Sequence, residues 1–187
     1  MTAITHEIRE KIQRIIVEQK ATHKEREELV EDAWSTIVAK QHLLMLGKGG
    51  SGKSYLIRDI SKRITEADGS QSTYFETAFD ETTTPDAVSG PPDIRGMVED
   101  GRTRRVVDGM LPDVFIAFLD EFFNGNQPVI HHTMPMLNER LFHNNGQPQE
   151  IPLWSCFMGA NKLNADADMA AAWDRVHRRH IVNYVTQ

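Results

Sequence analysis

A short glycine-rich stretch in the first third of the chain has the residue types of a phosphate-binding loop. It fits the pattern GxxxxGK[ST] and runs through Gly47, Lys48, Gly49, Gly50, Ser51, Gly52, Lys53 and Ser54. Glycines allow backbone angles that other residues avoid, so successive N–H groups can converge on phosphate oxygens. In such loops the lysine reaches the β- and γ-phosphates and the final hydroxyl ligates Mg²⁺. We therefore expect this stretch to bind a nucleoside triphosphate.

The sequence on either side of the loop gives it the expected setting. Residues 42–46 are apolar and predict a short buried strand, and apolar residues at helical spacing follow from Leu56 to Ile64, with Gly69 ending the run. The alternative is an ordinary glycine-rich turn between a strand and a helix. The position of the Gly-Lys-Ser triplet at the helix start favours the phosphate loop.

A second group of polar residues follows a continuous apolar run, residues 114–119, which predicts a strand buried on both faces. Asp120 and Glu121 come next, and an acidic pair there is costly unless it faces a cation or water. Beside a phosphate loop, Asp120 would hold Mg²⁺ and Glu121 would orient or deprotonate the attacking water. The alternative is an acidic helix cap after a core strand.

Two further residues are candidates for the same site. Asn161 follows the apolar strand predicted at 153–160, and its amide could contact the γ-phosphate or the attacking water. As a lone loop residue it could equally be a turn former. Arg175 lies before the last predicted strand and could offset transition-state charge, although surface arginines more often pair with a carboxylate.

Composition limits the class of protein. The chain has 187 residues, enough for one domain with a sizeable core. Its formal net charge of -6 argues against nucleic acid as the main partner, because nucleic-acid binders usually carry a basic excess. One cysteine cannot form an internal disulfide, and no stretch resembles a signal peptide or a membrane span. We expect a cytoplasmic protein without membrane contact.

Strands alternate with helices along the chain and predict a three-layer α/β fold around a mostly parallel sheet. Residues 1–40 predict two helices, with a capping box at 22–25, that pack on the core or on a neighbouring subunit. The sequence also predicts strands at 72–78, 153–160 and 181–184, helices from 84–87 and over 128–140, and hairpin turns at 104–109 and 144–146.

Together these segments resemble the AAA+ ATPases of the MoxR type, in their RavA-like branch, over residues 25–185. The phosphate loop and the FLDEFFNGN stretch resemble the family's nucleotide motifs. The other matching segments are residues 84–91, 101–102, 109–112, LNERLF at 137–142, MGANKL at 158–163 and WDR at 173–175.

The resemblance implies a five-stranded AAA+ core over residues 41–187, with hairpin insertions, and hydrolysis of ATP with Mg²⁺. It implies nucleotide contacts from Gly47 to Ser54, metal and water handling by Asp120 and Glu121, and sensing by Asn161. Arg175 would act across a subunit interface, with Arg178 and Arg179 as other candidates. The family also implies a hexameric ring, a protein client remodelled as by a chaperone, and a von Willebrand factor A domain partner.

The sequence departs from the family in two places. Lys48-Gly49-Gly50 stands where the family has a Pro-containing stretch, and we expect residues 1–187 to form the α/β core without the family's helical lid domain. A nucleotide-binding switch or scaffold with little hydrolysis is therefore a rival interpretation, and a DNA-associated AAA+ motor is another. Cys156 is expected to be a buried core thiol, and the histidine pairs 131–132 and 177/180 lack a third metal ligand.

Overall fold

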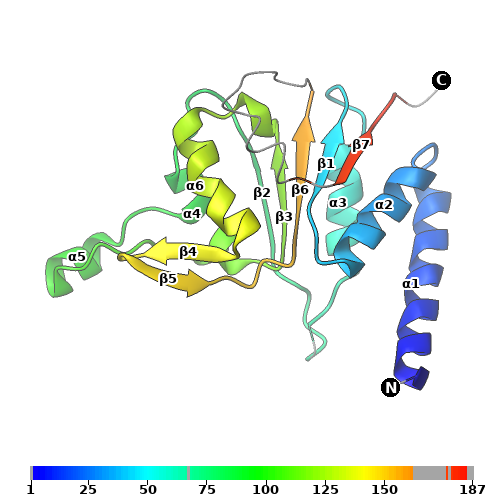
Figure 1. The fold of residues 1–187 in the computed structure, drawn as a ribbon, viewed down its shortest axis with the longest axis horizontal. Coiled ribbons are helices and arrows are strands. Elements are labelled where there is room, and N and C mark those ends of the chain that lie inside the picture. The colour runs from blue at the N-terminus through cyan, green and yellow to red at the C-terminus, as the bar shows by residue number, and fades with distance from the viewer. Residues whose placement is uncertain (1, 67, 162–175, 177, 185–187) are drawn as a thin grey trace.

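The computed structural model describes residues 2–66, 68–161, 176 and 178–184 (Figure 1). Its centre is a sheet of five strands in the order β2-β3-β6-β1-β7. Every neighbouring pair in this sheet is parallel. The strands are β1 (Leu43–Leu46), β2 (Tyr74–Ala78), β3 (Ile116–Asp120), β6 (Ser155–Ala160) and β7 (Arg178–Ile181).

The two faces of the sheet are buried in two separate apolar clusters. Side chains alternate between the faces of a strand, so Leu43 and Met45 enter one cluster while Leu44 enters the other. Phe118 and Phe157 join the first cluster, and both are fully buried. Continuous apolar strands therefore form here because both of their faces are covered.

Helices cover both faces of the sheet, which confirms the expected three-layer fold (Figure 1). On one side lie α2 (Glu27–Val38) and α3 (Lys53–Ser61), with α1 (Thr2–Thr22) packed on α2. On the other side lies α6 (Gln127–Asn138), near the short helix α4 (Asp86–Ser89). The remaining elements are α5 (Ile94–Asp100), the 3₁₀ turns η1 (Leu111–Asp113) and η2 (Phe122–Asn124), and the antiparallel hairpin of β4 (Leu141–Asn144) and β5 (Gln147–Glu150).

The start of α2 and the end of α3 differ from the sequence prediction. There is no capping box at 22–25, because α1 continues through Thr22, whose hydroxyl donates to the Glu18 carbonyl oxygen (3.1 Å). Arg26 stands at the start of α2, and its side chain does not cap the helix. Helix α3 ends at Ser61, and Gly69 instead serves a tight turn with a φ of 86°.

Two other predicted elements are placed differently. Residues 104–109 form no hairpin, because Arg105 bridges back to Pro92 across α5, a helix that the sequence pattern did not predict. The last strand is Arg178–Ile181, so it ends where the predicted strand began. The strand therefore includes the polar residues Arg178 and His180, whose side chains both contact Asp32 on α2.

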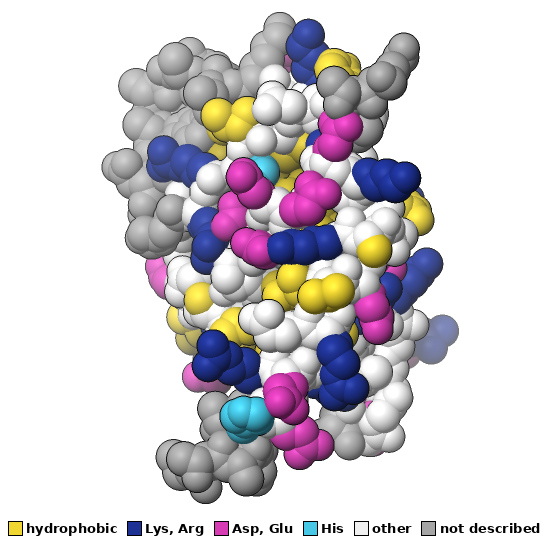
Figure 2. Space-filling model, turned by 90° about the vertical axis from the view of Figure 1, so that its right-hand side faces the viewer, with side chains coloured by type: hydrophobic (Ala, Val, Ile, Leu, Met, Phe, Trp, Pro, Cys, Tyr) yellow, Lys and Arg dark blue, Asp and Glu magenta, His cyan; other side chains and the backbone are white. Residues whose placement is uncertain are grey.

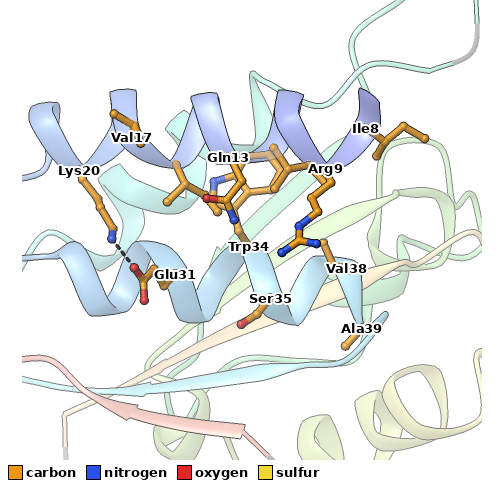
Figure 3. A pocket seen from close by; sticks show the side chains of 12 residues that line it. Ile8, Arg9, Gln13, Val17, Lys20, Glu31, Trp34, Ser35, Val38 and Ala39 are labelled. Carbon is orange, nitrogen blue, oxygen red and sulfur yellow. Dashed lines mark hydrogen bonds and ion pairs between the residues drawn. The ribbon is translucent and has the colours of Figure 1, made fainter. Parts of the chain in front are cut away.

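An open groove of ≈ 700 Å³ runs between α1 and α2 (Figure 3). Gln13 and Trp34 line its middle, and the ion pair between Lys20 and Glu31 lies toward one end. Val38 on its wall is 62% exposed. Acidic and basic side chains are interspersed over this side of the molecule (Figure 2). Helix α1 therefore covers α2 only in part.

The helices in the described part of the chain are each too short or too polar to cross a membrane.

A buried histidine joins three elements of the core. The Nδ1 atom of His42 accepts a hydrogen bond from the Cys156 backbone N–H (2.9 Å), so Nε2 carries the proton and donates to the Leu137 carbonyl oxygen (2.7 Å). Burial lowers the pKa of His42 to about 4, and the neighbouring Arg140 guanidinium adds to this effect. The neutral ring is therefore part of the folded state.

This histidine predicts a loss of stability in mild acid. The pKa of His42 is lower in the folded state than in the unfolded chain, so protons bind preferentially to the unfolded chain as the pH falls below about 6.5. Between pH 7.5 and pH 5 this one group should lower the free energy of unfolding by about 2 kcal/mol. Urea unfolding of the wild type and of His42→Asn at both pH values isolates the effect, because all other groups are shared. Equal pH dependence in the two proteins would contradict it.

Candidate functional site

The loop between β1 and α3 has the backbone of a phosphate cradle. Gly50 and Gly52 have φ angles of 78° and 84°, which disfavour any residue with a Cβ atom. Gly52 precedes the first residue of α3, so the helix begins at Lys53 and its N-terminal end faces the loop. Helix N-termini attract anions because their first N–H groups lack partners within the helix.

Two side chains of the loop are poised for an anion. The Lys53 side chain folds back over the loop, and its Nζ donates to the carbonyl oxygens of Gly47 and of Lys48 (3.4 Å for the latter). Lys53 is 5% exposed, which is unusual for a lysine. The Ser51 hydroxyl oxygen is buried and has no hydrogen-bond partner among the described residues. These features fit a bound phosphate group.

Asp120 reaches the loop across a glycine of the neighbouring strand. A Cβ atom added to Gly159 would lie 2.1 Å from Asp120 Oδ1 and 3.3 Å from Lys53 Cε. Strand β6, which carries Gly159, lies between β3 and β1 in the sheet. The absence of a side chain at Gly159 therefore lets the end of β3 approach the start of α3. Ser54 follows Lys53 directly, so the Ser54 hydroxyl and the Asp120 carboxylate are oxygen groups that could hold a divalent cation near Lys53.

Two amide groups hold the carboxylate of Glu121. Asn161 Nδ2 donates to Glu121 Oε1, and Asn124 Nδ2 donates to Glu121 Oε2 (3.0 Å). Glu121 itself has a φ of 50°, a left-handed backbone that is uncommon for a residue other than glycine. The structure thus brings together Glu121 and Asn161, which lie 40 positions apart in the sequence.

Two of the three candidate arginines, Arg178 and Arg179, lie in the described part of the chain. Arg175 lies outside the described residues. Arg178 pairs with Leu43 at the start of β1, away from the loop that follows the end of β1, and donates to Asp32 (3.0 Å). Arg179 Nε donates to the Val176 carbonyl oxygen (3.3 Å). Arg178 is therefore engaged with α2.

Asn124 is a site residue that the sequence argument missed. It ends the 3₁₀ turn η2, three positions after Glu121, and its backbone N–H donates to the Glu121 carbonyl oxygen (2.7 Å). Buried Phe122 and Phe123 anchor this turn in the core. The sequence signal that could have identified Asn124 is its position three residues after an acidic residue, with two aromatic core residues between them.

Metal binding by histidine or cysteine gains no support. No group of three or more potential His, Cys, Asp or Glu ligands occurs in the described part of the chain. His132 Nε2 contacts the Ser89 hydroxyl (2.8 Å), His180 pairs with Asp32 (2.7 Å), and His177 lies outside the described residues. Cys156 is fully buried, and burial raises the pKa of its thiol, as expected for a core residue.

The fold and site define a class of protein. A parallel sheet in the order β2-β3-β6-β1-β7, with a glycine loop after β1 and an acidic pair at the end of β3, is the α/β core of an AAA+ P-loop NTPase. Residues 10–187 match the family described as the MoxR domain in the MoxR-vWA-beta-propeller ternary systems. The chain belongs to this MoxR family of AAA+ ATPases.

The chain is also similar to two uncharacterized proteins of one organism. The chain is 34% identical over 176 residues to the uncharacterized protein MJ0079 of Methanocaldococcus jannaschii, covering 94% of this chain and 45% of that protein. It is 35% identical over 158 residues to MJ0812 of the same organism, covering 84% and 41%. The chain therefore spans less than half the length of these relatives.

Solved structures share the fold at low sequence identity. A crystal structure described as a candidate ATPase of Cytophaga hutchinsonii superposes with a TM-score of 0.70 at 11% identity, covering 95% of this chain and 52% of that one. The Hsp104–ADP complex of S. cerevisiae gives a TM-score of 0.65 at 13% identity, covering 94% and 36%. These likenesses establish the fold of the chain.

The close contact at Gly159 predicts a specific sensitivity to a methyl group. Gly159→Ala should force the ends of β3 and β6 apart or displace the Asp120 carboxylate, and overpacking of this kind costs about 1–3 kcal/mol. Gly49→Ala is the matched control, because a Cβ there meets no atom within 4 Å and φ is not positive. Chemical unfolding of both variants tests the difference, and an undisturbed Gly159→Ala protein would contradict the packing.

Proposed function

We propose that this chain binds ATP with Mg²⁺ at the loop of residues 47–54 and hydrolyses it to ADP and phosphate. The observation that carries the proposal is the convergence of Lys53, Asp120, Glu121 and Asn161 at one edge of the sheet. A phosphate-binding loop alone would serve many functions. A loop, a metal-ligating carboxylate and a second carboxylate fixed by an amide together suit phosphoryl transfer to water.

Each residue has a chemical role in this proposal. The loop N–H groups and Lys53 neutralise the β- and γ-phosphates, for which Lys53 would exchange its carbonyl partners. Ser54 and Asp120 would hold Mg²⁺, which supplies positive charge to the phosphate oxygens. Glu121 orients the attacking water and accepts its proton. Asn161 keeps one oxygen of that carboxylate in place and would sense the γ-phosphate.

The proposed chemistry predicts opposite phenotypes for two substitutions. Glu121→Gln should still bind ATP but lose turnover by about 10²- to 10⁴-fold, because an amide cannot accept the proton. Lys53→Ala should lose ATP binding itself, since the loop then lacks its phosphate cation. Fluorescent-nucleotide titration and phosphate release, each with and without EDTA, measure both quantities.

The same measurement separates the proposal from its rivals. Equal, slow phosphate release by the wild type and Glu121→Gln would identify a nucleotide-binding switch or scaffold instead. Unchanged ATP affinity in Lys53→Ala would show that the loop is structural. A DNA-associated motor is not favoured, because the net charge is -6 and charges of both signs alternate on the α1 side (Figure 2).

We infer that the working form is a ring, a hexamer as in the family resemblance, that remodels a protein client. The matching family is named for systems that combine a MoxR domain with a von Willebrand factor A domain and a β-propeller, so proteins with such domains are the proposed partners. In a ring built from one repeated head-to-tail interface, each nucleotide lies beside the next subunit. Arg175 is the proposed residue that reaches that neighbour's nucleotide.

A mixing experiment tests whether Arg175 acts between subunits. Arg175→Ala and Glu121→Gln should each be inactive alone, yet a mixture should recover turnover, because a Glu121→Gln subunit still offers Arg175 to a neighbour with an intact Glu121. Light scattering with and without ATP reports whether rings form under the same conditions. Rings that assemble but stay inactive on mixing would contradict a role for Arg175 in the neighbouring site.

A further inference from the structure

One buried arginine that the proposed chemistry does not use lies against the back of the phosphate loop. Arg26, at the turn between α1 and α2, is 9% exposed. Its Nε and Nη2 atoms both donate to the Ser51 carbonyl oxygen, at 3.2 and 3.0 Å. Nη2 also donates to the Asn183 carbonyl oxygen (2.7 Å) and Nη1 to that of Glu25 (2.6 Å). One guanidinium thus connects the N-terminal turn, the loop and the segment after β7.

The partners of Arg26 in the described part of the chain are all neutral. Every hydrogen bond of its guanidinium there ends on a backbone carbonyl oxygen, and no carboxylate among the described residues forms an ion pair with it. A buried charge without a counter-ion is costly, and proteins rarely keep one without a compensating anion nearby. The adjacent loop is where the proposed nucleotide brings its phosphates.

The bond to Ser51 also fixes the direction of a neighbouring N–H group. The Ser51 carbonyl and the Gly52 N–H belong to one planar peptide unit, and in a trans peptide the two groups point in opposite directions. Holding the carbonyl on Arg26 with two N–H groups therefore turns the Gly52 N–H away from Arg26. Charge-assisted bonds of this kind also polarise the peptide, which strengthens its N–H as a donor.

The loop has particular need of such an anchor. Glycine loses more conformational freedom on ordering than any other residue, and positions 49, 50 and 52 are all glycine. A second contact of the same kind is made by the Tyr184 hydroxyl, which donates to the Gly49 carbonyl oxygen (3.3 Å). A loop fixed before binding pays less ordering entropy when the ligand arrives.

We propose that Arg26 is a positioning residue of the nucleotide site. Its two hydrogen bonds to the Ser51 carbonyl oxygen order the Ser51–Gly52 peptide for phosphate binding. This inference rests on the proposed nucleotide binding by the loop. It assigns to the turn between the N-terminal helices a direct part in that binding. Lysine cannot replace arginine here, because one ammonium group lacks the planar fork that holds Ser51 and Asn183 together.

The test compares Arg26→Gln and Arg26→Lys with Arg58→Gln as the matched control. Arg58 lies on α3 but is exposed and binds Glu76, so its removal changes the net charge equally without touching the loop. We expect Arg26→Gln to weaken Mg²⁺-ADP and Mg²⁺-ATP binding by about tenfold or more, the value of a lost hydrogen bond to a charged group. Arg26→Lys should also bind more weakly than the wild type, and Arg58→Gln should bind equally well.

Hydrogen exchange of the nucleotide-free proteins provides the second readout. The peptide containing residues 47–54 should exchange faster in both Arg26 variants, while β1 and β6 keep their protection. Wild-type affinity in Arg26→Lys would show that charge alone suffices and would overturn the positioning role, as would unchanged exchange in the loop. If Arg26→Gln fails to fold, Arg26→Lys decides the question. A wild type that binds no nucleotide would refute the proposed function, whereas the exchange result would still test the anchor.

Discussion

A loop that turns its N–H groups toward a ligand must leave its carbonyl groups pointing elsewhere, and those carbonyls need donors of their own. In this protein the donors come from three places. Lys53 serves Gly47 and Lys48, Tyr184 serves Gly49, and Arg26 serves Ser51. The loop is therefore held from the outside by segments at both ends of the chain. Its shape depends on these contacts as much as on its glycines.

The sheet order brings the rest of the site to this loop. Because β6 separates β3 from β1, Asp120 must reach past β6, and Gly159 leaves the space for it. Parallel strands end at a common edge, so Glu121 after β3 and Asn161 after β6 meet directly. The left-handed backbone of Glu121 stores local strain, which the amides of Asn161 and Asn124 and the buried aromatics of η2 help to maintain.

Much of this arrangement was predictable from local sequence. The buried strands stood out as apolar runs, and the loop and acidic pair as motifs. Helix α5 was not predictable from local sequence, because its apolar residues Ile94 and Val98 are exposed and give no periodic pattern of buried positions. The last strand was misplaced because Arg178 and His180 bind Asp32 and hide its alternation. Contacts such as Arg26 with Ser51 join residues far apart in sequence, and no local pattern reports them.

The N-terminal helices are bound to α3, the helix that follows the loop, by directional polar contacts as well as by apolar packing. Burial alone would raise the pKa of Asp59 on α3, but hydrogen bonds from Gln19 (2.8 Å) and His23 (3.0 Å) hold it below its usual value. The carboxylate thus stays charged with donors supplied by α1 and the turn after it.

At the other edge, Asp32 on α2 binds Arg178 and His180 of β7. Helices α1 and α2 therefore grip both the helix that follows the loop and the strand beside β1. A shift of α3 or β7 would break hydrogen bonds whose geometry tolerates little movement. Any change of the loop on binding phosphate must then either stay within the loop or carry both N-terminal helices with it. The groove between α1 and α2 lies on the part of the molecule that such a movement would reach.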